Sequence, residues 1–262
     1  ITGFTFVPKK RLGQNFLVDR KVLNRIVDAC ELNSEETILE IGPGQGALTR
    51  AMLPYVKGIV GVEADRQLAE KLPQEFVGSN VIVYHDDFLK FDMGRVPGPL
   101  KVIGNLPYYI STPIITRVLE NRNCFTSLFM TVQLEFGERL VASVGSKDYS
   151  SLTCFVQYFA KPKILFKISN HAFQPVPKVQ SCFMRLDMRS EPAVKVLDED
   201  RFLKAIRTAF LQRRKTILNS LSSLWPKDQL AAALAASSVS ERSRAENLSL
   251  EDYAKITNAL LK

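Results

Sequence analysis

From about residue 19 to about residue 190, the chain alternates between two patterns of apolar residues. Short, nearly continuous apolar runs predict buried strands at 37–41, 59–63, 80–84, 100–104, 125–132, 163–168 and 180–187. Apolar positions spaced three or four residues apart predict amphipathic helices at 19–31, 46–55, 65–72, 113–120, 133–143 and 149–160. Strands that alternate with helices are typical of βαβ units. We therefore expect an α/β fold, with a mostly parallel sheet that helices cover on both faces.

The pattern changes at Ser190-Glu191-Pro192, and every element predicted after it is a helix. These helices are expected at 198–211, 214–223, 226–237 and 249–261. Ser249, with Asp252 three residues later, is a typical start of a helix. We therefore expect two domains, an α/β domain over 1–189 and a small all-helical domain over 190–262. The first domain would begin with a basic, aromatic arm over residues 1–18.

Composition adds a basic charge to this picture. The chain has 262 residues, of which 46% are hydrophobic and 24% charged, which are ordinary values for a globular protein. Its net charge of +8 favours a polyanionic partner. The charge is uneven, because residues 201–220 contain six Lys and Arg residues and no Asp or Glu.

Several classes of protein are disfavoured. The four cysteines are far apart and form no Cys/His cluster, so we expect no metal site and a reduced, cytoplasmic protein. No apolar run approaches the roughly 20 residues that span a membrane, and no secretory signal is visible. Because the chain begins at Ile1, an organellar location after removal of a transit segment stays an alternative.

A glycine-rich loop, Glu40-Ile41-Gly42-Pro43-Gly44-Gln45-Gly46, ends the first α/β strand and opens the next helix. Glycines at such a turn let the backbone approach a ligand closely. The spacing departs from the G-x-G-x-x-G pattern, and Glu40 would repel a pyrophosphate, which disfavours a nicotinamide dehydrogenase. An acid at this place suits a ligand with a cationic amino-acid end, such as S-adenosylmethionine.

Acidic residues also end the next two strands. Glu63 is placed to bind both hydroxyls of a ribose. Asp86-Asp87-Phe88 ends the third strand, where a carboxylate could accept an adenine amino group beside an apolar wall. Ligands of such sheets bind at the carboxyl ends of the strands. Three such features in order predict the cofactor site of a methyltransferase.

The segment Gly104-Asn105-Leu106-Pro107-Tyr108-Tyr109 follows another predicted strand. The Asn105 amide and the Leu106 carbonyl could accept the N–H bonds of a planar aromatic amine while its ring stacks on Tyr108. An enzyme that modifies a nucleobase amine must first take the base out of its stack. The alternative is an ordinary Asn-Pro turn that closes a buried strand.

Six ordered motifs give the chain a family resemblance over almost its whole length. They are Lys10–Leu17 (KRLGQNFL), Glu40–Gly46, Gly104–Pro113, Ala172–Val179 (AFQPVPKV), Gln212–Thr216 (QRRKT) and Arg244–Leu248 (RAENL). Together they resemble the rRNA adenine N6,N6-dimethyltransferase family, of the kasugamycin-sensitivity type. The resemblance implies a Rossmann-like class I methyltransferase sheet with a helical C-terminal domain. It also implies dimethylation, with S-adenosylmethionine, of two adjacent adenosines near the 3′ end of small-subunit (16S-type) rRNA during subunit biogenesis.

The loop pattern and the resemblance together assign residues to the site. The cofactor contacts expected are Gln14, Asn15, Leu17, Glu40, Gly42, Gly44, Glu63, Asp87, Phe88 and Asn105. By resemblance, Asn15 and Leu17, with Gln14 nearby, close over the methionine end of the cofactor. Asn105 and Leu106 would hold the target amine, with Tyr108 on one face of the base and Phe173 on the other. The Pro-rich, charged loop around Phe173 favours a surface position for that ring, against the alternative of a core aromatic.

A basic surface is expected to bind the RNA. Lys204, Arg207, Arg214 and Lys215 fall on one side of a helical wheel, opposite apolar residues. Arg213 and the arm residues Lys9, Lys10 and Arg11 would extend this surface. Such cations contact phosphates without reading sequence. The expected partner is the immature small ribosomal subunit, and the protein is expected to act as a monomer without a membrane.

Two other functions remain alternatives. One is the antibiotic-resistance relative that dimethylates an adenine of large-subunit rRNA. The other is a non-catalytic role, as an assembly checkpoint or an organellar transcription-factor relative. The Gln212–Thr216 and Ala172–Val179 motifs favour the small-subunit type. The intact acidic and amide set at the predicted site favours retained catalysis.

Overall fold

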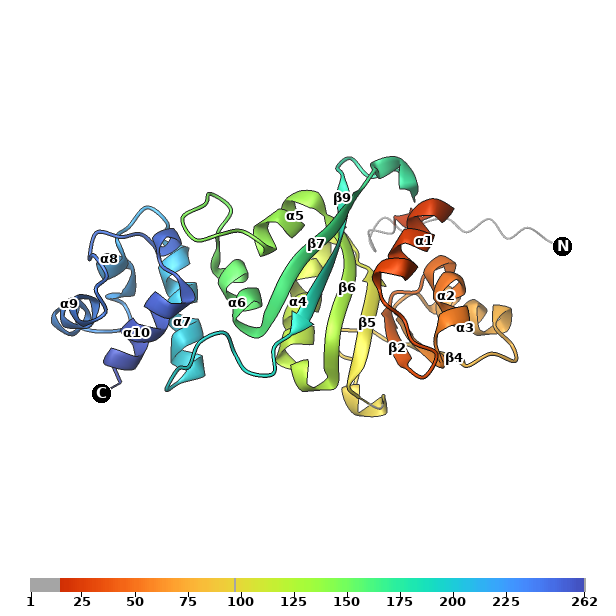
Figure 1. The fold of residues 1–262 in the computed structure, drawn as a ribbon, viewed down its shortest axis with the longest axis horizontal. Coiled ribbons are helices and arrows are strands. Elements are labelled where there is room, and N and C mark those ends of the chain that lie inside the picture. Colours follow the sequence, from red (N-terminus) through yellow and green to blue (C-terminus); the bar gives the residue numbers. More distant parts are fainter. Residues whose placement is uncertain (1–14, 97, 262) are drawn as a thin grey trace. The chain divides into compact units, whose positions relative to one another are not determined.

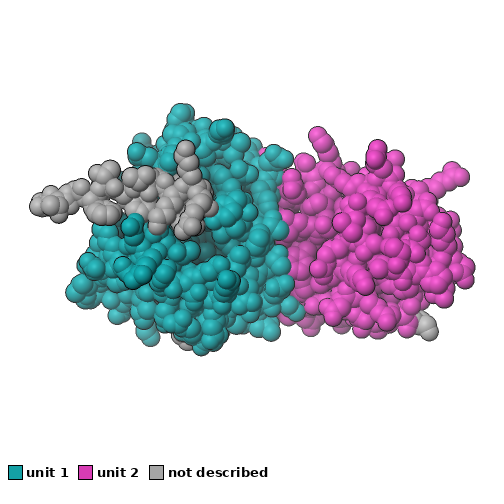
Figure 2. Space-filling view, turned by 180° about the vertical axis from the view of Figure 1, so that it is seen from behind, with its two compact units in different colours: residues 1–137, 163–188 teal, residues 138–162, 189–262 magenta. Residues whose placement is uncertain are grey.

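The computed structural model describes residues 15–96 and 98–261 (Figure 1). The chain divides into two compact units (Figure 2). The first comprises residues 1–137 and 163–188, and the second comprises 138–162 and 189–262. The second unit thus includes residues 138–162, which the sequence pattern placed in the first domain.

The first unit is built on a mostly parallel sheet, as the apolar pattern predicted. Its seven strands lie in the order β4-β3-β2-β5-β6-β9-β7. Their bounds are β2 Thr37–Ile41, β3 Gly58–Glu63, β4 Val81–His85, β5 Leu100–Asn105, β6 Phe125–Gln133, β7 Ala160–Ile168 and β9 Ser181–Met188. Strands β2 to β6 pair in parallel, and β9 pairs antiparallel with β6. This arrangement confirms the α/β class.

Helices fill three of the connections between the parallel strands. They are α2 Ala47–Met52 between β2 and β3, α3 Arg66–Glu75 between β3 and β4, and α4 Ser111–Glu120 between β5 and β6. Helix α1 Arg20–Ala29 precedes β2, and α5 Leu134–Leu140 follows β6. Short 3₁₀ turns are η2 Leu53–Tyr55, η3 Met93–Arg95, η4 Tyr108–Ile110, η5 Arg122–Cys124 and η6 Asn170–Ala172. The Asp19 side chain accepts hydrogen bonds from Lys21 N and Val22 N, so it caps α1 and satisfies two of the free amides of its first turn.

A second, two-stranded sheet joins two distant segments. Strand β1 (Phe16–Leu17) pairs antiparallel with β8 (Phe173–Gln174), and Leu17 lies opposite Phe173. The sequence pattern predicted an arm without a strand over residues 1–18, so this pairing was missed. Two residues are too short for a periodic signal, and the partner lies far away in sequence.

Phe173 belongs to the apolar core of this unit. Its side chain is 1% exposed and is buried in a cluster that includes Leu17, Ile26, Phe129 and Phe183. The expectation that the Pro-rich loop would hold this ring at the surface is therefore wrong. The loop does face solvent at Pro175, Val176, Lys178 and Val179, but Pro177 is buried and β8 turns Phe173 inward.

The second unit is helical. Its helices are α6 Ser151–Phe159, α7 Glu199–Leu211, α8 Ile217–Leu221, α9 Lys227–Ala236 and α10 Leu250–Ala259, with a 3₁₀ turn η7 Ala245–Asn247. The Tyr158 ring of α6 packs on Phe202 of α7 at 4.9 Å between centroids, and its hydroxyl donates to Glu199 at 3.2 Å. This buried contact explains why residues 138–162 cluster with the C-terminal helices. Ser249 and Asp252 form the capping box that the sequence predicted for α10.

One predicted helix starts later than expected. The Thr216 side chain accepts from Asn219 N and caps α8, so the helix begins at Ile217 and not at residue 214. Residues 212–216 form a turn after α7. Arg214 and Lys215 therefore extend from this turn and not from a helix face. None of the described helices combines the length and the apolar content needed to cross a bilayer.

The burial of Phe173 predicts a large effect on stability. Phe173→Ala should lower the free energy of unfolding by about 3–5 kcal/mol, because it leaves a cavity in a packed core. Val179→Ala, at a 45% exposed position in the same segment, should change it by less than about 0.5 kcal/mol. Urea denaturation of both variants measures the difference. Equal and small effects would contradict the core position of Phe173.

Candidate active site at the carboxyl ends of the strands

A cleft opens in the first unit where β2, β3, β4 and β5 end. Strand β2 pairs with β3 on one side and with β5 on the other, so the chain leaves these strands in opposite directions. Such a switch point forms a crevice at the carboxyl edge of the sheet. The cleft holds about 820 Å³ of empty space, part of it open to solvent. Its lining includes Gly42, Glu63, Asp86, Asp87, Phe88, Asn105, Leu106, Pro107 and Tyr108.

The glycine-rich loop forms one wall of the cleft. Gly42 and Gly44 have φ angles of +62° and +59°, in the left-handed region that favours glycine. A β-carbon on Gly42 would meet no atom within 4 Å, so this glycine keeps the backbone bare beside open space. A β-carbon on Gly44 would come within 3.0 Å of Phe16 Cε1. The Phe16 ring therefore packs directly on the loop.

Glu63 ties the loop to β3. Its side chain is 5% exposed, and its carboxylate accepts from Gly44 N at 2.9 Å and from Asp65 N at 2.8 Å. Burial raises the pKa of Glu63, and the backbone N–H bonds partly oppose that rise. The sequence placed Glu63 in the site but gave no sign that it also holds the loop.

The two aspartates after β4 both line the cleft, and they have different partners. Asp86 Oδ1 accepts from Asp87 N at 2.8 Å, and its Oδ2 lies 3.9 Å from Arg95. Asp87 Oδ1 accepts from Leu89 N at 3.0 Å. Phe88 is buried beside them. Because Asp86 faces a cation, Asp87 is the better candidate acceptor for a ligand amino group.

Asn105 is held in one orientation. Its Nδ2 donates to the main-chain carbonyl of Asn15 at 2.7 Å. Its Oδ1 has no hydrogen bond within the described part of the chain and can accept one from a ligand. Leu106 N donates to the Thr131 carbonyl at 3.2 Å, which fixes the start of the turn after β5. The amide oxygen and this turn therefore meet at the cleft.

Tyr108 lies on the same wall, in η4. Its ring is half-buried, and its hydroxyl lies 2.6 Å from Ser181 Oγ. Burial raises the pKa of Tyr108 above its usual value. Sequence reasoning missed Ser181, whose only signal is its place two residues after the Ala172–Val179 motif. Phe173 lines neither this cleft nor the adjoining cavity, because it is buried in the core.

A second cavity adjoins the cleft and shares Phe16, Gly42, Gly44 and Asn105 with it. Glu40 and Leu17 line this cavity and not the first. Glu40 is 2% exposed and accepts from Thr49 Oγ1 at 2.7 Å, and burial raises its pKa to about 7. The residues predicted to bind one cofactor are thus divided between two joined cavities.

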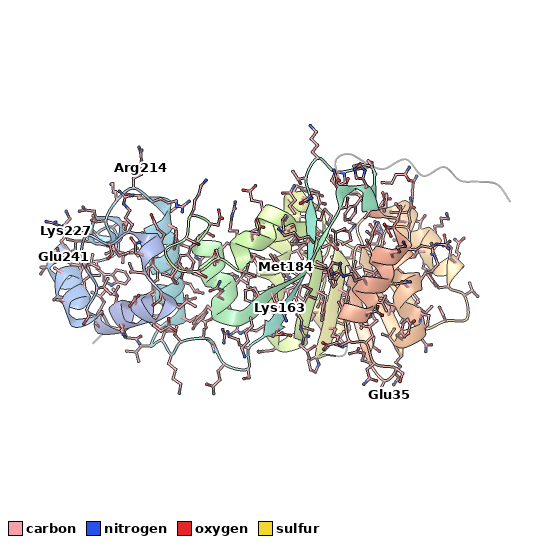
Figure 3. All side chains as sticks on the ribbon, turned by 45° about the horizontal axis from the view of Figure 1, so that its top comes forward. Glu35, Lys163, Met184, Arg214, Lys227 and Glu241 are labelled. Carbon is pink, nitrogen blue, oxygen red and sulfur yellow. The ribbon has the colours of Figure 1, made fainter. Side chains whose placement is uncertain are left out.

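The basic candidates of the second unit are exposed. They are Lys204, Arg207, Arg213, Arg214 and Lys215. The Arg214 side chain extends away from the helices of its unit (Figure 3). Arg213 Nη2 donates to the Lys147 carbonyl at 2.9 Å, which holds it against the loop after α5. The other predicted contacts, Lys9, Lys10, Arg11 and Gln14, lie outside the described residues. Within the described residues, no group of three or more His, Cys, Asp or Glu side chains could hold a metal ion.

Comparisons with known proteins agree on the family. The sequence model for ribosomal RNA adenine dimethylase matches residues 6–262. A "Ribosomal RNA small subunit methyltransferase A" from Moorella thermoacetica is 40% identical, over 97% of this chain and 93% of that protein. One of the same name from Alkaliphilus oremlandii is 41% identical, over 100% and 95%.

Two solved structures share the fold. A dimethyladenosine transferase from Plasmodium falciparum has a TM-score of 0.80 and 27% identity, covering 92% of this chain and 95% of that one. The 23S rRNA methyltransferase ErmE has a TM-score of 0.73 and 30% identity, covering 95% and 100%. These likenesses confirm the predicted methyltransferase sheet. The chain belongs to the ribosomal RNA adenine dimethylase family.

Proposed function

We propose that this protein uses S-adenosylmethionine to dimethylate the N6 amino groups of two adjacent adenosines near the 3′ end of small-subunit rRNA, as a step in subunit biogenesis. The observation that carries the proposal is the fixed amide of Asn105, whose Oδ1 accepts no hydrogen bond from the described residues; Asn105 lines the cleft together with Glu63 and Asp87. An amide acceptor beside an acidic cleft suits transfer to an aromatic amine.

The comparisons favour the small subunit over the large one. Relatives named for the small subunit are 40% and 41% identical to this chain, whereas the 23S enzyme is 30% identical. A non-catalytic role is disfavoured because the acidic and amide groups are all present and face the two cavities. We propose that the protein acts as a monomer in the cytoplasm, on the immature small subunit.

The residues of the two cavities fit the cofactor. When bound, S-adenosylmethionine supplies an electrophilic methyl group on a sulfonium. Glu63 would bind the ribose hydroxyls, and Asp87 would accept from the adenine amino group beside Phe88. The bare backbone of Gly42 leaves room at the loop. Glu40 and Leu17, which line the second cavity, and Asn15, which lines the first cleft, would surround the cationic methionine end.

The target amine needs orientation more than a strong base. The lone pair of an adenine N6 is delocalised into the ring, so the nitrogen is a poor nucleophile. Asn105 Oδ1 and the Leu106 carbonyl would accept its two N–H bonds and direct the lone pair toward the methyl group. The amine becomes acidic only as it gains the methyl, so alignment and fixed dipoles can supply most of the acceleration. Tyr108 would stack on one face of the base.

The exposed cations of the second unit would bind RNA phosphates. Lys204 and Arg207 lie on α7, and Arg213, Arg214 and Lys215 follow in the turn. Phosphate contacts position an RNA without reading its sequence, so recognition of the subunit would depend on shape.

Removal of the Asn105 amide should abolish transfer. The wild-type protein should transfer tritiated methyl groups to immature small subunits and not to large-subunit RNA, as N6,N6-dimethyladenosine. Asn105→Ala should lower kcat by about 10²-fold or more, because it removes a preorganised acceptor. Asn80→Ala is the matched control, since Asn80 Nδ2 also donates to a backbone carbonyl, at 3.0 Å, but Asn80 lines neither cavity. Full activity of Asn105→Ala would refute the mechanism.

A comparison of alanine substitutions at two glycines distinguishes an effect on cofactor binding from an effect of backbone strain. Gly42 and Gly78 both have positive φ, at +62° and +84°, and a β-carbon on either would meet no atom within 4 Å. Alanine at either position should therefore cost about 1–2 kcal/mol of stability. Only Gly42→Ala should weaken S-adenosylmethionine binding, by roughly tenfold, because only Gly42 lines the cleft. Calorimetric titration measures the cofactor affinity of both variants, and equal affinities would contradict a cofactor contact at Gly42.

Charge reversal tests the RNA surface. Arg207→Glu with Arg214→Glu should weaken small-subunit binding by about tenfold or more and reduce its salt dependence. Cofactor affinity should stay unchanged. Lys227→Glu with Lys255→Glu gives the same change in net charge at exposed positions on α9 and α10, and should have a smaller effect. If both pairs weaken binding equally, the effect is one of net charge and not of this surface.

A further inference from the structure

The hydrogen bond between Tyr108 and Ser181 joins the cleft to a fixed point in the sheet. Tyr108 lines the cleft, whereas Ser181 does not and is 0% exposed. We propose that Ser181 is a positioning residue, which holds the Tyr108 ring as a rigid stacking face for the target base. The inference rests on the proposed function. It gives Ser181, at the end of the segment 172–181, a role at the cleft, which Phe173 does not line.

Backbone pairing fixes Ser181 and the residues before and after it. It is the first residue of β9 and lies opposite Gln133 of β6, and the preceding Gln180 carbonyl accepts from Leu134 N at 2.9 Å. Cys182 continues the same register opposite Val132. The position of the Ser181 Oγ is thus set by the sheet and not by a mobile loop.

The other end of the Tyr108 side chain is also fixed. Pro107 precedes it, and the Pro107 carbonyl accepts from Ile110 N at 3.1 Å and from Ser111 Oγ at 3.2 Å. The ring is therefore held at its backbone by a closed turn and at its hydroxyl by Ser181. The neighbouring Tyr109 is 57% exposed, which shows that a tyrosine in this turn need not be packed.

A ring held at both ends reduces what base binding must cost. An unanchored tyrosine would lose rotational freedom when the base stacks on it, and that loss would oppose binding in the reactive pose. A preset ring plane also fixes the angle at which the amine meets Asn105. Because burial raises the pKa of Tyr108, the phenol stays protonated and keeps its proton for the bond. The anchor should therefore act on kcat more than on cofactor affinity.

The test is a double-mutant cycle with Tyr108→Phe and Ser181→Ala. Each single variant should lower kcat for small-subunit methylation about five- to tenfold, as expected for one lost hydrogen bond. The double variant should be no slower than either single one, because both changes remove the same bond. S-adenosylmethionine affinity should be unchanged. Selective labelling of Tyr108 should show by NMR that its ring reorients faster in Ser181→Ala than in wild type.

Two controls separate positioning from stability. Tyr55→Phe removes a hydroxyl from a 55% exposed ring in η2, and Ser127→Ala removes one from a 3% exposed serine of β6. Both should retain wild-type kcat, whatever they do to the melting temperature. If Ser181→Ala does not fold, Tyr108→Phe and its ring-matched control still decide the result.

Three results would overturn the anchor: wild-type kcat in Tyr108→Phe, additive losses in the double variant, or an unchanged ring-flip rate in Ser181→Ala. A wild-type protein that methylates no small subunit would instead refute the proposed function. The NMR measurement needs no substrate, so the two failures are distinguishable.

Discussion

The whole site depends on the parallel pairing of β2 with β3 on one side and with β5 on the other. That pairing brings the ends of four strands to one edge of the sheet, and the diverging connections leave a crevice there. Glu40, Glu63 and Asn105 need no long loop to reach it, because each lies at the carboxyl end of its strand. The backbone hydrogen bonds of the sheet thus set the positions of these three side chains.

The same edge concentrates buried acid. Glu40 and Glu63 are both nearly fully buried, and desolvation raises the pKa of each, to about 7 for Glu40. The folded protein therefore holds the Glu40 proton more tightly than the unfolded chain, so this group weakens stability as pH rises from about 4.5 to about 7. A ligand cation nearby would favour the charged form and lower both pKa values. The unfavourable burial of these acids is consistent with a site selected for a cationic ligand.

The sequence was sufficient for features that depend on local pattern. Strand ends, the glycine loop and the Ser249 capping box each carry a signal within a few residues. It failed where a distant partner decides. Phe173 was expected at the surface because its neighbours are polar, but pairing with β1 turns it into the core. Ser181 could not be found, because its role depends on a hydroxyl 73 residues away.

Phe173, which was wrongly expected at the surface, is connected to Asn105 through the protein core. Phe173 lies opposite Leu17 in the two-stranded sheet, and both side chains are buried in one core cluster. Two residues before Leu17, the Asn15 carbonyl accepts the Nδ2–H bond that orients Asn105. Core packing at Phe173 therefore fixes β1, β1 places the Asn15 carbonyl, and that carbonyl decides that Asn105 offers oxygen and not nitrogen to the cleft. On this view, the Ala172–Val179 motif supports the site indirectly, because Phe173 helps to orient the Asn105 amide. Ser181 supports the site through its hydrogen bond to Tyr108.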